Sequence, residues 1–305
     1  MKLAFAGTPE FAATILRGLL GSGHTVGLVV SQPDARRGRG RKTAPTPVAE
    51  LAKEAGLVLV QPARIGEVVS EISRHDALIV AAYGQILRLD TLEACPRGAW
   101  NVHASLLPAY RGAAPIERAI MAGEAATGVS IMKMGEGLDT GPVALKKEVP
   151  ISPNTTGGEL TSELAHVGAE AIVEGMDALE SGTMRLGGQD DSQASYAPKI
   201  SAEERTLNWE RDASEVHDRI RALAPHIGAR ASHRKVSGPV RLLGSKVVEE
   251  DPSLAAGEIL NGEGRMFVGC GEGAIELLEL QLPGGRPLPA AEFLRGNSLE
   301  GSFHS

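Results

Sequence analysis

Aromatic residues and cysteines are scarce in this sequence. Phenylalanine, tryptophan and tyrosine together make up 3% of its 305 residues, so a nucleic acid could not be held mainly by stacking on aromatic rings. The two cysteines, Cys95 and Cys270, lie far apart and have no histidines at metal-ligand spacing. We therefore expect two buried thiols, in keeping with a reducing cytoplasm, and no metal site.

Long apolar runs and several common motifs are also absent from the sequence. No hydrophobic stretch approaches the roughly 20 residues that cross a bilayer, and the first five residues enter a strand pattern without a signal-peptide core. The chain contains neither a P-loop nor a G-x-G-x-x-G fingerprint, so an α/β fold here would not imply a dinucleotide. No serine lies in a G-x-S-x-G turn, which excludes that kind of nucleophile.

Charge is distributed unevenly along a chain whose net charge is −7. Residues 36–42 carry five basic side chains and no acid, and residues 219–246 carry seven, again with no acid. Residues 247–305 compensate with ten acidic and three basic residues. Two basic clusters on an acidic protein indicate a docked polyanion, although the second cluster alone is also typical of a solvated face.

Apolar runs alternate with helical patterns through the first part of the chain. The expected strands are residues 3–6, 25–30, 57–60 and 77–82. The expected helices between the first of them are residues 9–20 and 48–55. This alternation predicts an α/β fold with a doubly wound, Rossmann-like and mostly parallel sheet.

The second half of the chain indicates a change of architecture. We expect a helix at residues 113–122, strands at 128–134 and 143–149, and one long helix at 156–181. A polar, glycine-rich stretch follows, then a short helix at 214–224 and several short β-type runs that suggest a small barrel. We therefore divide the chain into a first domain at residues 1–186, a linker at 187–204 and a second domain at 205–305.

Three polar residues have a spacing that suggests chemistry. Asn101 and His103 are two apart, so on a strand both side chains leave the same face. Asp139 lies in the segment Gly135–Pro142, where three glycines and a proline predict a tight turn. An amide, an imidazole and a carboxylate can hold a tetrahedral oxyanion and move a proton in acyl transfer. With no cysteine or serine nucleophile nearby, the attacking atom would come from the substrate.

The turn Leu138–Gly141 also contains the Asp-Thr-Gly of aspartic proteases. A single-chain enzyme of that class needs a second such turn, so that two carboxylates share a proton. The sequence contains no second Asp-Thr-Gly or Asp-Ser-Gly. We therefore reject this interpretation.

Taken together, several segments resemble the formyltetrahydrofolate-dependent formyltransferases. The strongest are Asn-x-His-x-Ser-Leu-Leu-Pro at residues 101–108, Tyr-Arg-Gly-Ala-Ala-Pro-Ile at 110–116, and Asp-Thr-Gly-Pro at 139–142. Within that family, the match is closest to the members that act on methionyl-tRNA. Further agreement extends over nearly the whole chain, at residues 5–12, 31–34, 81–87 and 196–200.

The resemblance implies the substrates and the parts played by the three polar residues. The donor would be 10-formyltetrahydrofolate, and the acceptor the α-amino group of methionine esterified to initiator tRNA. Asn101 and protonated His103 would donate hydrogen bonds to the oxyanion that forms when the amine attacks. Asp139 would favour the imidazolium and hold a water that takes the amine proton. Which group accepts that proton first stays open.

The resemblance also implies binding residues. Ser105, Leu106, Leu107 and Pro108 should form a rigid loop lining the folate site, although this segment is also typical of an ordinary strand-to-helix loop. Residues 81–87 and 135–140 would complete the pterin walls through backbone contacts. The basic residues of the first cluster should contact the tRNA acceptor end: Arg36, Arg37, Arg39, Arg41 and Lys42. Arg111 is equally consistent with a loop brace and with a ligand contact.

The second domain would be an OB-like barrel that binds tRNA. Residues 224–229 replace an aromatic segment that is usual in the family, so its hold on tRNA should be mostly electrostatic and salt-dependent. Nothing in the sequence indicates an obligate protein partner or a membrane.

Three other functions compete with this interpretation. The same site would serve a formyltransferase for an amino sugar nucleotide or glycinamide ribonucleotide, although a small nucleotide does not require five clustered basic residues. A hydrolase that releases formate from formyltetrahydrofolate is a second alternative, but it should lack the basic second domain. A non-catalytic tRNA-binding protein is a third, and the intact Asn101, His103 and Asp139 argue against it.

Overall fold

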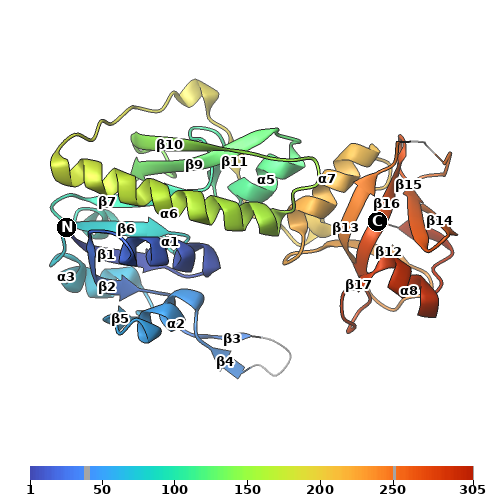
Figure 1. The fold of residues 1–305 in the computed structure, drawn as a ribbon, viewed down its shortest axis with the longest axis horizontal. Helices are drawn as coiled ribbons and strands as arrows, with labels where there is room; N and C mark the ends of the chain where they lie inside the picture. Colours follow the sequence, from blue (N-terminus) through green and yellow to red (C-terminus); the bar gives the residue numbers. More distant parts are fainter. Residues whose placement is uncertain (38–41, 250–251, 305) are drawn as a thin grey trace. The chain divides into compact units, whose positions relative to one another are not determined.

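The structure is a computed structural model that describes residues 1–37, 42–249 and 252–304. Packing divides the chain into two compact units, each made of three segments that alternate along the sequence (Figure 1). The N-terminal unit comprises residues 1–112, 126–150 and 161–197, and the C-terminal unit comprises residues 113–125, 151–160 and 198–305. The functional domain boundaries that we place at residues 186 and 204 stay a prediction.

A seven-stranded sheet forms the centre of the N-terminal unit, in the order β10-β9-β7-β6-β1-β2-β5. Its strands are β1 Lys2–Gly7, β2 Thr25–Val30, β5 Leu59–Val60, β6 Ala77–Ala81, β7 Ala99–His103, β9 Ala126–Lys133 and β10 Val143–Pro150. Five neighbouring strands are parallel, namely β7, β6, β1, β2 and β5, whereas β9 and β10 are antiparallel to their neighbours. The predicted mostly parallel, Rossmann-like sheet is confirmed.

Helices cover both faces of this sheet. They are α1 Glu10–Leu20, α2 Pro47–Glu54, η1 Ile65–Val68, α3 Val69–Ile72, α4 Leu89–Leu92 and α6 Gly157–Ser181. Helices α1 and α6 pack on one face at closely fitting glycines, since a Cβ added to Gly18 would lie 2.7 Å from the Cβ of Ala169, and one added to Gly168 2.9 Å from Val102. On the other face, Ile65, Ile72 and Leu92 pack in one core with strand side chains such as Leu28 and Leu78.

The cysteine thiols lie in the two cores. Cys95 and Cys270 are buried thiols outside any disulfide, as predicted, and burial raises the pKa of the Cys95 thiol to about 11. Among the described residues, no helix is both long and apolar enough to cross a membrane.

Two short strand pairs were not predicted from the sequence. Strands β3 Ala35–Arg37 and β4 Lys42–Ala44 form the antiparallel stem of a hairpin. Strands β8 Arg111–Gly112 and β11 Tyr196–Ala197 pair in parallel, so residues of the expected linker are part of the N-terminal unit.

The C-terminal unit contains a closed antiparallel barrel. Its strands are β12 Ala229–His233, β13 Val240–Val247, β14 Glu258–Gly262, β15 Arg265–Gly269, β16 Ala274–Gln281, β17 Leu288–Pro289 and β18 Gly301–His304. Six of them run in the order β13-β12-β18-β14-β15-β16, and pairing of β13 with β16 closes the ring. The predicted small barrel is therefore confirmed.

Three α-helices lie entirely within the described part of the C-terminal unit: α5 Pro115–Met121, α7 Ala213–Leu223 and α8 Ala290–Gly296. Val216 and Ile220 of α7 and Phe293 of α8 are buried in the barrel core, where Trp209 stacks on Phe303 with 5.7 Å between ring centroids. Three aromatic residues, Trp209, Phe293 and Phe303, thus belong to this core.

Candidate active site

Strand β7 supplies two of the three predicted catalytic side chains. It lies between β6 and β9, with Asn101 beside Val80 and Met132 and with His103 beside Ser130. Asn101 is half-buried and His103 is buried. Because the strand is held on both sides, the two side chains have a fixed spacing on one face.

The turn between β9 and β10 brings Asp139 to this pair. Asp139 has left-handed backbone geometry, with φ at 51°. Its Oδ2 accepts a hydrogen bond of 2.9 Å from the Gly112 N–H and lies 3.7 Å from His103 Nδ1, while its Oδ1 lies 3.5 Å from Asn101 Nδ2. The structure therefore brings the amide, imidazole and carboxylate together within one unit.

The histidine ring is oriented by its other nitrogen. His103 Nε2 lies 3.0 Å from the carbonyl oxygen of Tyr110. A carbonyl only accepts, so Nε2 carries a proton, and Nδ1 faces the carboxylate of Asp139. At 3.7 Å the contact between Nδ1 and Asp139 is longer than a hydrogen bond, which leaves Nδ1 available to another partner.

Hydrogen bonds hold the segment Ser105–Pro108, and two of its side chains face inward. Ser105 and Leu107 are fully buried, while Leu106 and Pro108 are partly exposed. The Ser105 hydroxyl donates to the Ala109 carbonyl at 2.6 Å, and the Leu107 N–H donates to the Ser130 hydroxyl at 3.0 Å. A ligand beside this loop would meet its backbone and the partly exposed side chains.

A pocket of about 360 Å³ adjoins this segment in the N-terminal unit. Its lining includes Leu107 and Pro108, residues 143–146 and residues 187–190. Leu107 and Pro108 thus form one wall of a pocket, and residues 187–190 of the expected linker form the opposite wall.

The loop after β6 is tied to the ends of neighbouring strands. The Tyr83 carbonyl accepts hydrogen bonds from Thr8 Oγ1 at 2.9 Å and from Gln32 Nε2 at 3.1 Å. These loops follow the carboxyl ends of parallel strands, the edge where open α/β sheets bind ligands.

Two large apolar side chains near this edge are left uncovered. Ile86 is 94% exposed, and Leu138, next to Asp139, is 61% exposed. We expected only backbone contacts from these loops, so both side chains were missed. The available signal was an apolar residue inside a polar or glycine-rich turn.

Three basic residues of the first cluster lie on the paired strands β3 and β4. Arg36 and Arg37 belong to β3 and Lys42 to β4, with Arg37 paired to Lys42 across the stem. Arg39 and Arg41 lie outside the described residues. The paired strands give Arg36, Arg37 and Lys42 regular structure, where the sequence had suggested only a loop.

Arg111 is 2% exposed and contacts other parts of the N-terminal unit. Its guanidinium donates to the side chains of Gln189 and Asp191. Of the two interpretations left open for this residue, the structure supports the brace.

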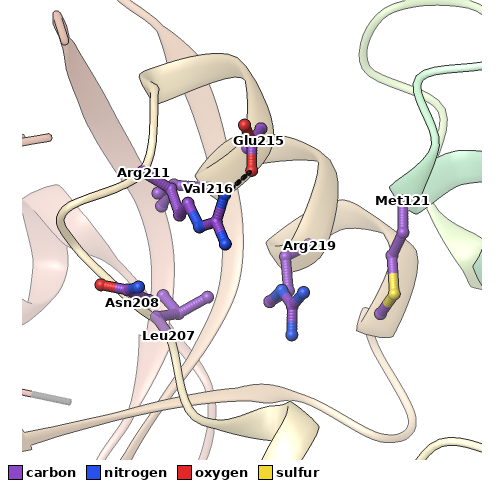
Figure 2. A pocket seen from close by; sticks show the side chains of 7 residues that line it. All are labelled: Met121, Leu207, Asn208, Arg211, Glu215, Val216 and Arg219. Carbon is purple, nitrogen blue, oxygen red and sulfur yellow. Dashed lines mark ion pairs between the residues drawn. The ribbon is translucent and has the colours of Figure 1, made fainter. Parts of the chain in front are cut away.

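The C-terminal unit has a pocket of its own, of about 240 Å³, at helix α7 (Figure 2). Arg211 and Arg219 line it, together with Met121 of α5. Arg211 pairs with Glu215 at 3.7 Å, and Arg219 donates to the Glu204 carbonyl at 2.8 Å. Arg219 is thus the residue of the second basic cluster that lines this pocket, and both arginines already have protein partners.

A Rossmann-like sheet that carries an amide, an imidazole and a carboxylate, followed by a small barrel, defines a class of group-transfer enzymes. A family model described as formyl transferase matches residues 1–176, and a model described as the formyl transferase C-terminal domain matches residues 199–298. The chain belongs to the formyl transferase family.

Individual relatives extend the likeness over the whole chain. Methionyl-tRNA formyltransferase of Rubrobacter xylanophilus is 66% identical over 304 residues, covering 99% of both chains. The protein of the same name from Bartonella henselae is 42% identical, again over 99% of both. Among solved structures, the N-formyltransferase of Helicobacter canadensis, in complex with folinic acid and dTDP-3-aminofucose, matches with a TM-score of 0.69 and 19% identity. It covers 91% of this chain and 98% of its own.

Proposed function

We propose that this protein transfers the formyl group of 10-formyltetrahydrofolate to the amino group of methionyl-tRNA, giving the N-formylmethionyl-tRNA that initiates translation in the cytoplasm. The observation that carries the proposal is the 66% identity to a methionyl-tRNA formyltransferase across 99% of both chains. A relative that shared only the first unit would support formyl transfer without supporting this acceptor.

The site offers a mechanism that needs no protein nucleophile. The methionyl amine attacks the formyl carbon, and negative charge develops on the formyl oxygen. The Asn101 amide, which lies only at the limit of hydrogen bonding to Asp139, donates to that oxygen, and so does the Nδ1 proton of His103. Collapse of the intermediate breaks the bond to the folate nitrogen, which takes up a proton as it leaves.

Asp139 holds the charge balance of this arrangement. Its carboxylate faces the imidazolium and is itself held by the Gly112 N–H. It also offers an oxygen to a water that accepts the proton of the attacking amine. The carboxylate of Asp139 thus has two tasks, which are pairing with the imidazolium and binding the water.

The folate would lie against the loops at the carboxyl ends of the strands. Ile86 and Leu138 supply apolar walls for the flat pterin, and the backbone of residues 105–108 supplies polar contacts. Membership of the family and the folinic acid bound to the Helicobacter canadensis protein support this donor.

The basic residues Arg36, Arg37, Arg39, Arg41 and Lys42 would contact the tRNA acceptor end. Arginines suit this task, because a guanidinium both pairs with phosphate and stacks on a splayed base. The pairing of β3 with β4 fixes the backbone of Arg36, Arg37 and Lys42, which supports a contact with the tRNA.

The experiment is a transfer assay with radiolabelled 10-formyltetrahydrofolate and three acceptors: methionyl-tRNA, a dTDP-amino sugar and water. We expect label on methionyl-tRNA. The amino sugar is the second candidate, because a solved structure of similar fold holds dTDP-3-aminofucose. Label on the sugar alone would overturn the tRNA proposal, and release of formate alone would indicate a hydrolase.

A further inference from the structure

The turn that carries Asp139 is gripped by a half-buried glutamine. Gln189 donates both hydrogens of its side-chain amide to this turn, one to the Asp139 carbonyl at 2.8 Å and one to the Gly141 carbonyl at 2.7 Å. The left-handed backbone of Asp139 persists only if its surroundings hold it. Gln189 supplies such a hold, directly at the residue concerned.

Arg111 decides which way this amide points. Its Nε and Nη2 donate to Gln189 Oε1 at 3.1 and 2.8 Å, and Nη2 also donates to Asp191 at 2.8 Å. A flipped amide would place the Gln189 oxygen against two carbonyl oxygens and its NH₂ against the guanidinium. Arg111 therefore favours the single orientation that grips the turn.

The same segment also holds the residues that face Asp139 and His103. Ser195 accepts the Tyr110 N–H on its hydroxyl at 2.9 Å and the Arg111 N–H on its carbonyl at 2.9 Å. Tyr110 in turn offers its carbonyl to His103, and Gly112 its N–H to Asp139. Gln189 and Ser195 thus support the two ends of the imidazole–carboxylate contact.

We propose that Gln189, oriented by Arg111, is a positioning residue for formyl transfer that acts through Asp139. The inference rests on the proposed function. It follows from distance: Asp139 approaches His103 and Asn101 at 3.7 and 3.5 Å, so a small shift of the turn changes both contacts. A displacement of about 1 Å at a reacting group is enough to cost about 10²-fold in rate.

The test is a mutant cycle read by kcat. Gln189→Met keeps the length of the side chain and removes its hydrogen bonds, and we expect kcat to fall about 10²-fold with little change in either KM. In the Asp139→Asn background the same change should have little further effect, because the carboxylate to be positioned is already gone. A merely structural residue would cost the same in both backgrounds.

A second readout does not depend on activity. The Gly112 amide proton, which is bonded to Asp139 at 2.9 Å, should move upfield in the NMR spectrum of Gln189→Met as this bond lengthens. Gln189→Asn, whose amide is one methylene shorter, should behave alike and serves if the Met variant folds poorly. Gln193→Met is the matched control, since that amide lies on the same segment but bonds Asp190 at 3.1 Å.

The two proposals fail in different ways. A wild-type protein that transfers no formyl group contradicts the proposed function, and the Gly112 shift then still decides whether Gln189 sets the turn. An active wild type whose Gln189→Met and Gln189→Asn variants keep full kcat, or an unmoved Gly112 shift, overturns the positioning inference. Loss in Gln193→Met equal to that in Gln189→Met would overturn it too.

Discussion

At the scale of the residue, the site depends on which nitrogen carries which proton. The carbonyl of Tyr110 fixes a proton on His103 Nε2, so the group that can serve the substrate is Nδ1. Asn101 reaches Asp139 only at 3.5 Å, so its amide can turn to a substrate oxygen with little loss. In the proposed mechanism, both donors act on charge that exists mainly in the transition state.

We expect His103→Ala and Asn101→Ala each to lower kcat for formyl transfer by about 10²- to 10³-fold, as does the loss of one oxyanion donor elsewhere. Folate affinity, measured by fluorescence or calorimetry, should change little, because the ground-state formyl oxygen carries no full charge. His166→Ala is the control, since that exposed ring bonds only its own helix, through the Ser162 carbonyl. Either variant keeping more than a tenth of wild-type kcat would mean that the oxyanion site lies elsewhere.

At the scale of the element, regular structure was predictable and supporting segments were not. Helix α6 begins where Thr156 and Glu159 cap it reciprocally, a signal that can be read from four residues. The spacing of Asn101 and His103 has meaning only on a strand, and β7 Ala99–His103 is that strand. The stretch 187–197 looks like a linker because it is polar and glycine-rich. Its structure comes from contacts such as Arg111 to Gln189, 78 residues apart, which no local pattern records.

The hairpin β3–β4 carries the element-scale prediction. Arg37→Glu with Lys42→Glu reverses two charges at paired positions of the stem. We expect a much higher KM for methionyl-tRNA and a flatter dependence of affinity on salt. The log–log slope should fall by about 0.7 to 0.9 for each tRNA phosphate that the protein no longer neutralises. The KM for 10-formyltetrahydrofolate should stay the same.

The matched control for the hairpin is Arg74→Glu with Arg185→Glu, which makes the same change of charge at exposed positions of the same unit. This control separates a local contact from the general effect of a more acidic protein. Equal loss in both double variants would assign the effect to net charge, and wild-type kinetics in the hairpin variant would remove the hairpin from tRNA binding.

At the scale of the whole molecule, the stability of the C-terminal unit should depend on pH through a buried histidine. His217 Nε2 lies 3.0 Å from the Pro153 carbonyl, which only accepts, so Nε2 is protonated and Nδ1 accepts from the Ser245 hydroxyl at 2.9 Å. The ring is therefore neutral in the folded protein. Burial is the main cause that lowers the pKa of His217, and nearby Arg221 adds to it.

The sign of the effect follows from this lowered pKa. In the unfolded chain His217 takes up a proton as the pH falls below about 6.5, whereas the folded protein resists protonation until a lower pH. The stabilisation from the neutral ring is thus fully present above the unfolded pKa and is lost progressively as the pH falls below it. Denaturant unfolding at pH 7.5, 6.5, 5.5 and 5.0 should show a declining free energy of unfolding.

His217→Gln should have a lower stability at pH 7.5 but a flatter decline toward pH 5.0, because the group that takes up the proton is gone. His226→Gln, at an exposed position, should keep the wild-type decline. His233 is a second buried histidine whose pKa is lowered by burial. Part of the decline in the free energy of unfolding should therefore persist in His217→Gln, and the decline should become smaller still when His233 is also replaced. An unchanged slope in the His217→Gln variant would show that its ring is not held neutral by the contacts to Pro153 and Ser245.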